Sequence, residues 1–559
     1  MKTRVRDIVE QGDRLFSKRG QLLSLWQSMA ENFYPQRADF TTSRSLGTEF
    51  ASYLMSGTPV LAHRDLGNSL SAMLRPRGQA WFHARTNSEG LNKDAESRKF
   101  LDWISDVMRI AMYDQRSQFV RATKEGDHDF VAFGQCVISV EPNQYLDGIL
   151  YRTWHLRDVA WCESAELRID NVHRNWKPEA RQQIKLFPKT VSPKVRELLE
   201  REPYREIKCR HIIIPEDEYD LSTEKKGRRN RLPFTSIYVD CENEVILEEV
   251  PAKRVPYVIP RWQTVSGSQY AHSPATVVAL PDARMLQQIT LTLLEAGQKA
   301  VDPPMKATSE AISGGVNMYA GGITWVDNEY DEKMGAALEP VFDPAKLRLD
   351  WGAHREEKVE RLIAEAFFLN VINLPQERGK EMTAYETQER VKEYVRRVLP
   401  LFEPMEVEYN GALCEATFDL CSDLNMFGAF DDMPKKLSNQ DIVWQFESPL
   451  QASNERIKSQ QFMESANLLA VAAQMDQNAR VNLDVDKAFR DALSGSVPST
   501  WIVSEEQAAE AKQAAEQMQQ AAAQAQVVAG VAGVAQQVGA AAEQAGRGAS
   551  AIQEAGLAA

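Results

Sequence analysis

The sequence predicts an α+β protein with several structural units, and three observations support this. The chain has 559 residues, which is long for one domain, and 43% of them are hydrophobic, enough for a sizeable core. Apolar residues recur with a helical period before residue 134 and after residue 275, whereas the part between them is rich in β-branched and aromatic runs. Because strands and helices come in runs and do not alternate strictly, α+β is the expected class.

The first part of the chain is expected to be helical. One long apolar pattern covers residues 3–33 and stops at Tyr34-Pro35, because the residue before a proline disfavours the helical conformation. Similar patterns predict helices at about 57–74, 94–113 and 117–134.

The middle of the chain is expected to form short strands. These are predicted at residues 136–141, 149–155, 167–174, 207–215, 234–240, 244–250 and 255–261. Short helices at about 178–186 and 192–201 interrupt them.

Two helical rods are predicted after residue 275. The first ends near Val301, before Asp302-Pro303-Pro304, and Pro281 is expected in its first turn, where a missing N–H costs nothing. The second covers about 351–372, and some twenty residues give a rod of roughly 30 Å. Residues 302–350 between them contain Gly, Pro and short extended pieces, one of them at 322–326.

The rest of the chain reads as a polar loop followed by helices. Residues 373–382 are polar, and Thr383 with Glu386 forms a capping box for a helix that ends at Pro400. A further helix carries Cys414 and Cys421, an extended piece covers 443–446, and helices resume at about 452–475. The Ala/Gln-rich segment from about 504 favours helix but cannot build a core alone, so it must pack on copies of itself or fray.

Charge and cysteine content narrow the class of function. The net charge of −14 argues against a protein that grips DNA phosphates tightly, but not against one that DNA slides past. The six cysteines form no C-x-x-C pair, which indicates buried thiols in a reducing compartment. No apolar signal region and no stretch of about 18 apolar residues is present, so we expect a soluble protein that is cytoplasmic when made.

Several local signals receive an ordinary structural interpretation. The basic run Lys225–Arg231 is interpreted as a solvated loop, with a DNA or capsid contact as the alternative. In Asp127-His128-Asp129, adjacent helical residues point in different directions, so a metal site is not expected. Asp431-Asp432 is interpreted as a turn.

No catalytic residue, metal ligand or cofactor is predicted. Gly314-Gly315 and Gly321-Gly322 lack the Gly-Lys-Ser/Thr ending that cradles phosphate, and there is no G-x-S-x-G nucleophile elbow. The energy for any work on DNA would therefore come from another protein.

The order of these parts resembles the podovirus head-to-tail connecting family, the phage portal proteins, over nearly the whole chain. The matching pieces are Trp26 with Pro35 and Phe40, Leu66 to Leu70, Met73 to Pro76 with Trp81-Phe82, Arg174 to Phe187, Leu280 to Ala283 through Lys299 to Pro304, Met382 to Glu386, and Phe446 to Leu450.

The resemblance implies a portal fold in a dodecameric ring. Its parts would be a wing (1–274), a first stem helix (275–301), a clip (302–350), a second stem helix (351–372), a tunnel loop (373–384), a helical wing and crown (385–503), and a C-terminal helix or barrel (504–559). The stem helices would bury apolar faces on neighbouring subunits, as ring closure through heterologous contacts requires.

The resemblance also implies a function without catalysis. The ring would be a channel at the capsid vertex of the virion for packaging and ejecting double-stranded DNA. Its partners would be the terminase large subunit, the major capsid and scaffolding proteins, and tail adaptors, with no membrane. The residues expected nearest the DNA are those of the tunnel loop, namely Gln376, Glu377, Arg378, Lys380 and Glu381.

Two other classes of protein fit the sequence less well. A metal-dependent nuclease would need a ligand cluster, which the sequence lacks. An internal virion or adaptor protein outside the portal ring would consist of long helices, which the strand-rich region 136–261 disfavours.

Overall fold

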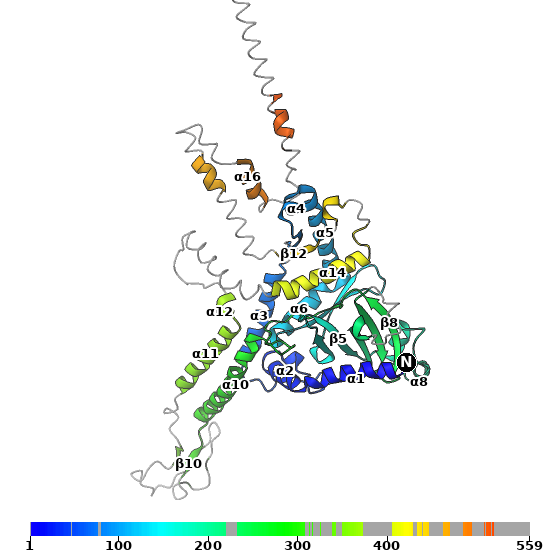
Figure 1. Ribbon diagram of the computed structural model, residues 1–559. Coiled ribbons are helices and arrows are strands. Elements are labelled where there is room, and N and C mark those ends of the chain that lie inside the picture. The colour runs from blue at the N-terminus through cyan, green and yellow to red at the C-terminus, as the bar shows by residue number, and fades with distance from the viewer. Residues whose placement is uncertain are drawn as a thin grey trace, which may run out of the picture. The chain divides into compact units, whose positions relative to one another are not determined.

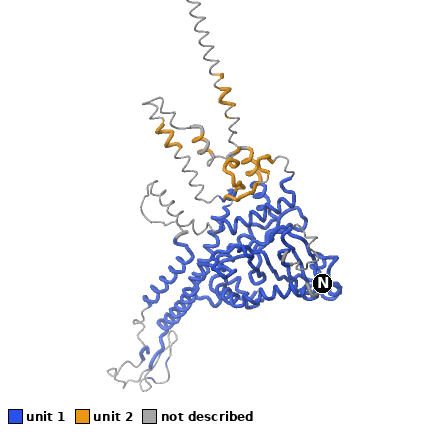
Figure 2. The backbone as a smooth tube through the Cα atoms, viewed as in Figure 1, with its two compact units in different colours: residues 1–82, 105–429, 446–450 blue, residues 83–104, 430–445, 451–559 orange. Residues whose placement is uncertain are grey.

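The computed structural model describes most of the chain up to residue 446 and shorter stretches after it (Figure 1). The described residues are 2–45, 47–76, 80–219, 232–307, 312, 316, 323, 325, 338–341, 349–372, 405–428, 433–438, 440–446, 462–469, 485–494, 508, 510–515 and 517–518. The chain divides into two compact units (Figure 2). Unit 1 is Met1–Phe82, Ser105–Ala429 and Phe446–Leu450, and unit 2 is His83–Ile104, Phe430–Gln445 and Gln451–Ala559.

Unit 1 begins with two helices where the sequence predicted one. α1 (Lys2–Lys18) and α2 (Gly20–Phe33) are separated at Arg19, so the expectation of a continuous helix over 3–33 is wrong there. The buried guanidinium of Arg19 donates hydrogen bonds of 2.5–2.7 Å to three carbonyl oxygens, those of Leu156, Arg157 and Val159. A buried cation must have its donors satisfied, and these distant carbonyls fix the change in direction between the two helices.

The next helices follow the predictions closely. α2 ends before the 3₁₀ turn η1 (Pro35–Arg37), as expected from Tyr34-Pro35. α3 (Thr58–Leu74), α5 (Ala95–Tyr113) and α6 (Phe119–Phe133) lie within two residues of the predicted bounds. α6 ends at Gly134, whose φ is +75°, and a Cβ there would lie 2.3 Å from the carbonyl carbon of His272. Only glycine fits this position.

Two antiparallel sheets form the centre of unit 1, and the α+β class is confirmed. The larger has the order β4-β5-β6-β7-β8, with β4 (Val159–Glu163), β5 (Ile169–Trp176), β6 (Cys209–Pro215), β7 (Phe234–Asp240) and β8 (Val245–Ala252). The smaller has the order β3-β2-β9, with β2 (Val137–Pro142), β3 (Ile149–Trp154) and β9 (Tyr257–Val258).

Most of the predicted strands are present. β4 was not predicted, because it is a short run directly after the 3₁₀ turn η3 (Leu156–Asp158) and depends on pairing with β5. The strand predicted over 255–261 is confined to Tyr257–Val258, where the chain pairs with β2.

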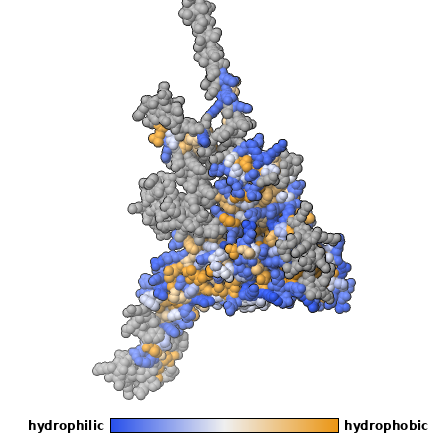
Figure 3. All heavy atoms as spheres, in the orientation of Figure 1, coloured by the Kyte–Doolittle hydropathy of each residue, from blue (hydrophilic) through white to orange (hydrophobic). Residues whose placement is uncertain are grey.

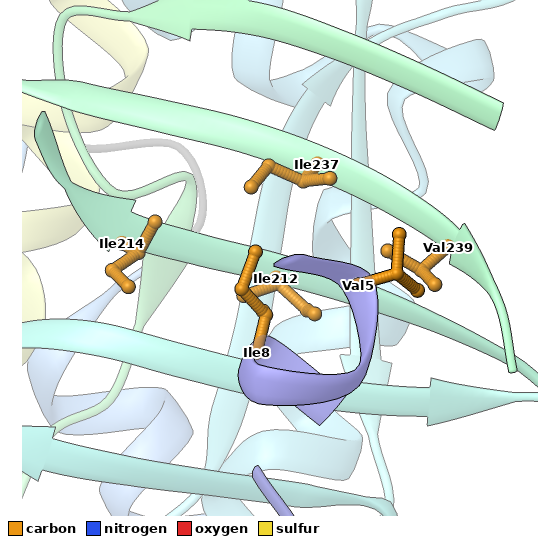
Figure 4. Close-up of a cluster of buried hydrophobic side chains, with 6 residues drawn as sticks. All are labelled: Val5, Ile8, Ile212, Ile214, Ile237 and Val239. Atoms are coloured by element: carbon orange, nitrogen blue, oxygen red, sulfur yellow. The ribbon is translucent and has the colours of Figure 1, made fainter. Parts of the chain in front are cut away.

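α1 packs on one face of the five-stranded sheet. Val5 and Ile8 of α1 contact the side chains of Ile212, Ile214, Ile237 and Val239 from β6 and β7 (Figure 4). Residues two apart in a strand share a face, so the pairs 212/214 and 237/239 project together. Full burial of such side chains contributes about 1.5–3 kcal/mol each.

Two short helices pack on a second cluster of the same sheet. α7 (Ala180–Leu186) and α8 (Pro193–Arg201) confirm the predicted helices at 178–186 and 192–201. The cluster comprises Ala180, Val191, Val195, Ile207, Cys209 and Leu247. Since Cys209 and Ile212 are an odd number of residues apart on β6, this cluster lies on the face opposite to α1.

Two long helices lie side by side in unit 1 as a helical hairpin (Figure 1). They are α10 (Pro274–Val301) and α11 (Leu349–Ala366), and the strands β10 (Met305–Ala307) and β11 (Leu338–Pro340) pair just beyond their ends. Among the described helices, none is long and apolar enough to cross a bilayer.

Pro281 is in the interior of α10, so its predicted place in the first turn is wrong. Pro274 occupies that first turn instead, after the N-cap Ser273, whose Oγ accepts a hydrogen bond from the Thr276 N–H. An interior proline costs about 3 kcal/mol of helix stability. The helix persists because Ala279, Leu280 and Ala283 around it are buried.

The second rod, expected over 351–372, is broken at its end. α11 stops at Ala366 and the short helix α12 (Leu369–Ile372) begins after Phe368, whose φ is +56°. Phe367 is fully buried, with its ring centroid 5.3 Å from that of Phe33. Burying this aromatic side chain outweighs continuing the helix.

The C-terminal part of unit 1 contains the predicted cysteine-bearing helix. α14 (Ala412–Asp423) carries Cys414 and Cys421, both buried, and follows a π-helix at Glu406–Gly411.

Unit 2 contains a two-stranded sheet and short helices. The sheet pairs β1 (Phe82–Thr86) with β12 (Ile442–Phe446), which confirms the extended piece predicted at 443–446. The helices are α4 (Glu89–Lys93), the start of α5, a helix at 462–469 within the predicted 452–475, and α16 (Val485–Ser494). In the Ala/Gln-rich segment, the described residues 508, 510–515 and 517–518 are helical.

Candidate functional site

The helical hairpin is attached to the body of unit 1 by polar contacts on one of its faces. The side-chain amide of Gln287 accepts hydrogen bonds from the N–H groups of Met55 and Ser56 at 2.6 and 2.9 Å, and donates to the Ser56 carbonyl at 2.9 Å. Beside it, the Thr58 hydroxyl donates to the Glu360 carboxylate at 2.8 Å. Both hairpin helices are therefore tied to the start of α3.

The two helices approach each other closely along their length. A Cβ added at Gly352 would lie 2.4 Å from the Leu293 side chain, so glycine allows this approach. The Thr290 hydroxyl donates to Glu356 at 2.6 Å, and the buried side chains of Leu286, Val359 and Ile363 fill the contact nearer the body. These contacts fix which residues of each helix face the other.

The hairpin exposes several large apolar side chains. The exposed fractions are 88% for Val301, 71% for Trp351, 62% for Val278, 53% for Leu294 and 38% for Leu362. Figure 3 shows hydrophobic residues gathered where α10 meets α2. A concentration of exposed apolar side chains marks a protein interface.

The charges of the hairpin do not favour tight binding of nucleic acid. α11 carries five carboxylates against three basic side chains, and α10 carries two of each. Strong phosphate binding needs a basic surface.

The residues expected nearest the DNA lie outside the described residues. These are the tunnel-loop residues Gln376, Glu377, Arg378, Lys380 and Glu381. The basic run Lys225–Arg231, the pairs Gly314-Gly315 and Gly321-Gly322, and Asp431-Asp432 also lie outside them. Their assignments stay predictions.

The structure explains Asp127-His128-Asp129 through ion pairs. Asp127 binds Arg75 of the α3 C-terminus in a fully buried pair, and Asp129 binds Arg37 with two hydrogen bonds of 3.0 and 2.7 Å. Burial by itself would lower the pKa of Arg37 and of Arg75. The carboxylate that faces each arginine has the larger effect, so the pKa of both guanidinium groups is raised. Sequence reasoning missed these pairs, because the partners are 52 and 92 residues apart.

The π-helix brings a third polar group to the Arg75–Asp127 pair. The Asn410 side-chain oxygen accepts from Arg75 at 2.9 Å, and its amide donates to the Leu74 carbonyl at 3.3 Å. The Arg75 guanidinium also lies 4.7 Å from the centroid of the Tyr409 ring. Together these contacts hold the π-helix against α3 and α6.

Several histidine and cysteine side chains of the described regions are buried in the core, among them His63, His173, Cys136 and Cys414. Burial lowers the pKa of His63 and of His173 to about 3, and it raises the pKa of Cys136 and of Cys414. Within the described part of the chain, no group of three or more His, Cys, Asp or Glu side chains could hold a metal ion.

Comparison with known proteins identifies the family of this chain. The profile of the "Bacteriophage head to tail connecting protein" family matches residues 6–499. The chain is 25% identical to the "Probable portal protein" of Bordetella phage BPP-1, over 91% of this chain and 92% of that protein. It is 21% identical to the "Portal protein" of Salmonella phage epsilon15, over 91% of each chain.

A solved structure titled "Virion of native gene transfer agent (GTA) particle" also matches, at 10% identity with a TM-score of 0.34, over 74% of this chain and 86% of that one. That similarity is too low to carry an argument about this fold. The family profile, in contrast, spans most of the sequence. The chain therefore belongs to the bacteriophage head-to-tail connecting protein family.

Proposed function

We propose that this chain is a portal protein, whose copies form a ring-shaped channel for packaging the genome into a phage capsid and for ejecting it. The observation that carries the proposal is the family match over residues 6–499, with two relatives named portal proteins aligned over 91% of this chain. The hairpin of α10 and α11 supports it, because its exposed apolar side chains need partner surfaces.

The parts of the proposed portal follow the order of the chain. The sheets and helices of residues 1–274 are the wing, α10 and α11 are the stem, and the residues between them (302–350) are the clip. Residues 373–384 are the tunnel loop, 385–503 contribute to wing and crown, and 504–559 form a C-terminal helix or barrel. The antiparallel pairing of α10 and α11 supports the stem assignment.

The proposed channel acts through weak contacts with DNA. The chain carries a net charge of −14, and an acidic surface repels the duplex and keeps it mobile. Transient contacts would come from the tunnel loop, with Gln376, Glu377, Arg378, Lys380 and Glu381 nearest the duplex. Replacing Arg378 and Lys380 with alanine should change the length of packaged DNA or its retention.

The proposed partners supply what the ring itself lacks. Twelve copies form the ring at the portal vertex of the virion, after synthesis in the host cytoplasm. The terminase large subunit provides the energy for packaging, so the ring needs no catalytic group. Capsid and scaffolding proteins surround the ring, and tail adaptors dock after packaging.

The first experiment is electron microscopy of the purified full-length chain, with class averages down the particle axis. Rings with a central hole of about 20 Å or more, wide enough for a duplex, support the proposal and count the subunits. Chains that stay monomeric at high concentration, with no ring in assembled particles, would overturn it in favour of an internal virion or adaptor protein.

A further inference from the structure

The hairpin has two opposite faces, which the structure defines by their contacts. We call face A the one on which Gln287 and Glu360 bond to Ser56 and Thr58. We call face B the one on which the Arg355 guanidinium lies 4.0 Å from the Met285 sulfur. Between these faces runs the contact line of Leu293 with Gly352.

Helix geometry assigns the exposed apolar residues to these faces. Residues seven apart in an α-helix point in nearly the same direction, because each residue turns about 100°. Leu294 and Val301 lie seven and fourteen residues after Gln287, so they lie on face A. Leu362 lies seven residues after Arg355, and Trp351 one turn before it, so both lie on face B.

The two faces also differ in charge. On face A, Glu360 and the neighbouring Glu357 are acidic, and Ala353 lies between them and the tip. On face B, Arg355 and Lys358 of α11 and Lys299 of α10 are basic. Glu365 and Glu295 lie there as well, so this face carries a small positive excess whereas face A is acidic. Of these charged residues, Glu357, Arg355, Lys358 and Lys299 are exposed and Glu360 is partly buried. Opposite signs on opposite faces are complementary when one face meets the other.

We propose that face A of one copy of this chain packs on face B of the next copy, with Trp351 of one hairpin against Leu294 of its neighbour. A ring is closed by such a heterologous contact, in which two different patches meet. With the ring axis parallel to the hairpin, rotation from one copy to the next leaves each residue at the same position along that axis, which we call its height. Trp351 and Leu294 are at the same height, since Gly352 lies against Leu293. This inference rests on the proposed ring.

Cysteine cross-linking of the full-length chain tests the pairing. We expect the double variant Leu294→Cys, Trp351→Cys to give a ladder of covalent oligomers on non-reducing gels after oxidation of assembled rings. Each single variant should give no more than the wild-type background, because the two positions belong to different faces. Covalent dimers from either single variant would indicate like faces in contact and overturn the proposal.

Microscopy separates failure of this inference from failure of the proposed function. Double-variant rings that are visible but give no ladder would refute the pairing while leaving the portal proposal intact. Wild-type chains that form no ring would instead refute the portal function.

A charge-reversal series tests the same contact without cysteines. We expect Arg355→Glu or Glu357→Arg alone to lower the yield of rings several-fold at low salt, and the two together in one chain to restore it. Circular dichroism of each variant confirms that the chain is folded. A double variant that assembles no better than the single variants would contradict the pairing of faces A and B.

Discussion

The five-stranded sheet and the helical hairpin differ in how far their apolar side chains are covered by the rest of the chain. The sheet covers its apolar residues within the chain, with α1 on one face and α7 and α8 on the other. The hairpin leaves Leu294, Val301 and Trp351 more than half exposed. The comparison teaches that the sheet is covered by other parts of its own chain, whereas the outer part of the hairpin keeps large apolar side chains exposed to solvent.

The largest effect is expected where the body buries a charge. Asp127→Ala leaves Arg75 without its carboxylate in a fully buried site, which should cost about 3–5 kcal/mol of stability. Chemical denaturation followed by tryptophan fluorescence measures this. The control is Asp65→Ala, which removes the exposed ion pair with Arg64 and should cost under about 1 kcal/mol. Equal effects of the two changes would contradict the role given to burial.

A slightly smaller effect is expected in the core between α1 and the sheet. Ile212→Ala removes a fully buried side chain and leaves a cavity beneath Val5 and Ile8, which should cost about 2–5 kcal/mol. The matched change in the hairpin, Leu294→Ala, should alter the stability of the unassembled chain by less than about 0.5 kcal/mol. If both variants shift the denaturation midpoint alike, the contrast between sheet and hairpin is wrong.

A pH dependence should separate the same two regions. Burial lowers the pKa of His173 from 6.5 to about 3, with a further contribution from Arg210. Below pH about 6.5, His173 is protonated in the unfolded chain but stays neutral in the folded one. The contribution of His173 to the free energy of unfolding is therefore fully present above that pH and decreases as the pH falls toward 3.

The measurement is thermal melting of wild type and variants between pH 7 and 4. His173→Leu should flatten the fall in melting temperature, and His354→Leu, on the exposed surface of α11, should leave it unchanged. Burial also lowers the pKa of His63 to about 3. Because His63 is present in both variants, part of the fall in melting temperature with pH should remain in each of them. An unchanged slope in His173→Leu would exclude this histidine as a source of acid sensitivity.

The smallest effect on the chain itself is expected at Trp351. Trp351→Ala changes a side chain that is 71% exposed, so the melting temperature of the unassembled chain should move little. Assembly should fall sharply, because aromatic side chains at the centre of an interface often contribute 2 kcal/mol or more, roughly thirty-fold in affinity. Sedimentation velocity measures the shift from ring to monomer. Loss of stability without loss of assembly would reverse our interpretation of the hairpin.

The sequence predicted what depends on neighbouring residues. Proline at position 35 and the apolar period fixed the end of α2 and the bounds of α3, α5 and α6, because helix stops and apolar stripes are properties of local sequence. The sequence did not reveal the break between α1 and α2 at Arg19, because the carbonyl groups that bind its guanidinium are 137 to 140 residues away. The family could be recognised from short sequence motifs, because their order along the chain is a property of the sequence alone.

The features of the candidate site can also be separated into those that the sequence predicted and those that only the tertiary structure revealed. The sequence by itself determined the two rods and the acidic balance. The tunnel loop as the place of DNA contact stays a prediction from the family resemblance. The tertiary structure decided that Pro281 is an interior residue, that Asp127 and Asp129 pair with arginines, and that Leu294 and Trp351 lie on opposite faces. Local patterns specify which residues form a helix, but only packing between distant segments specifies which side of that helix is left for a partner.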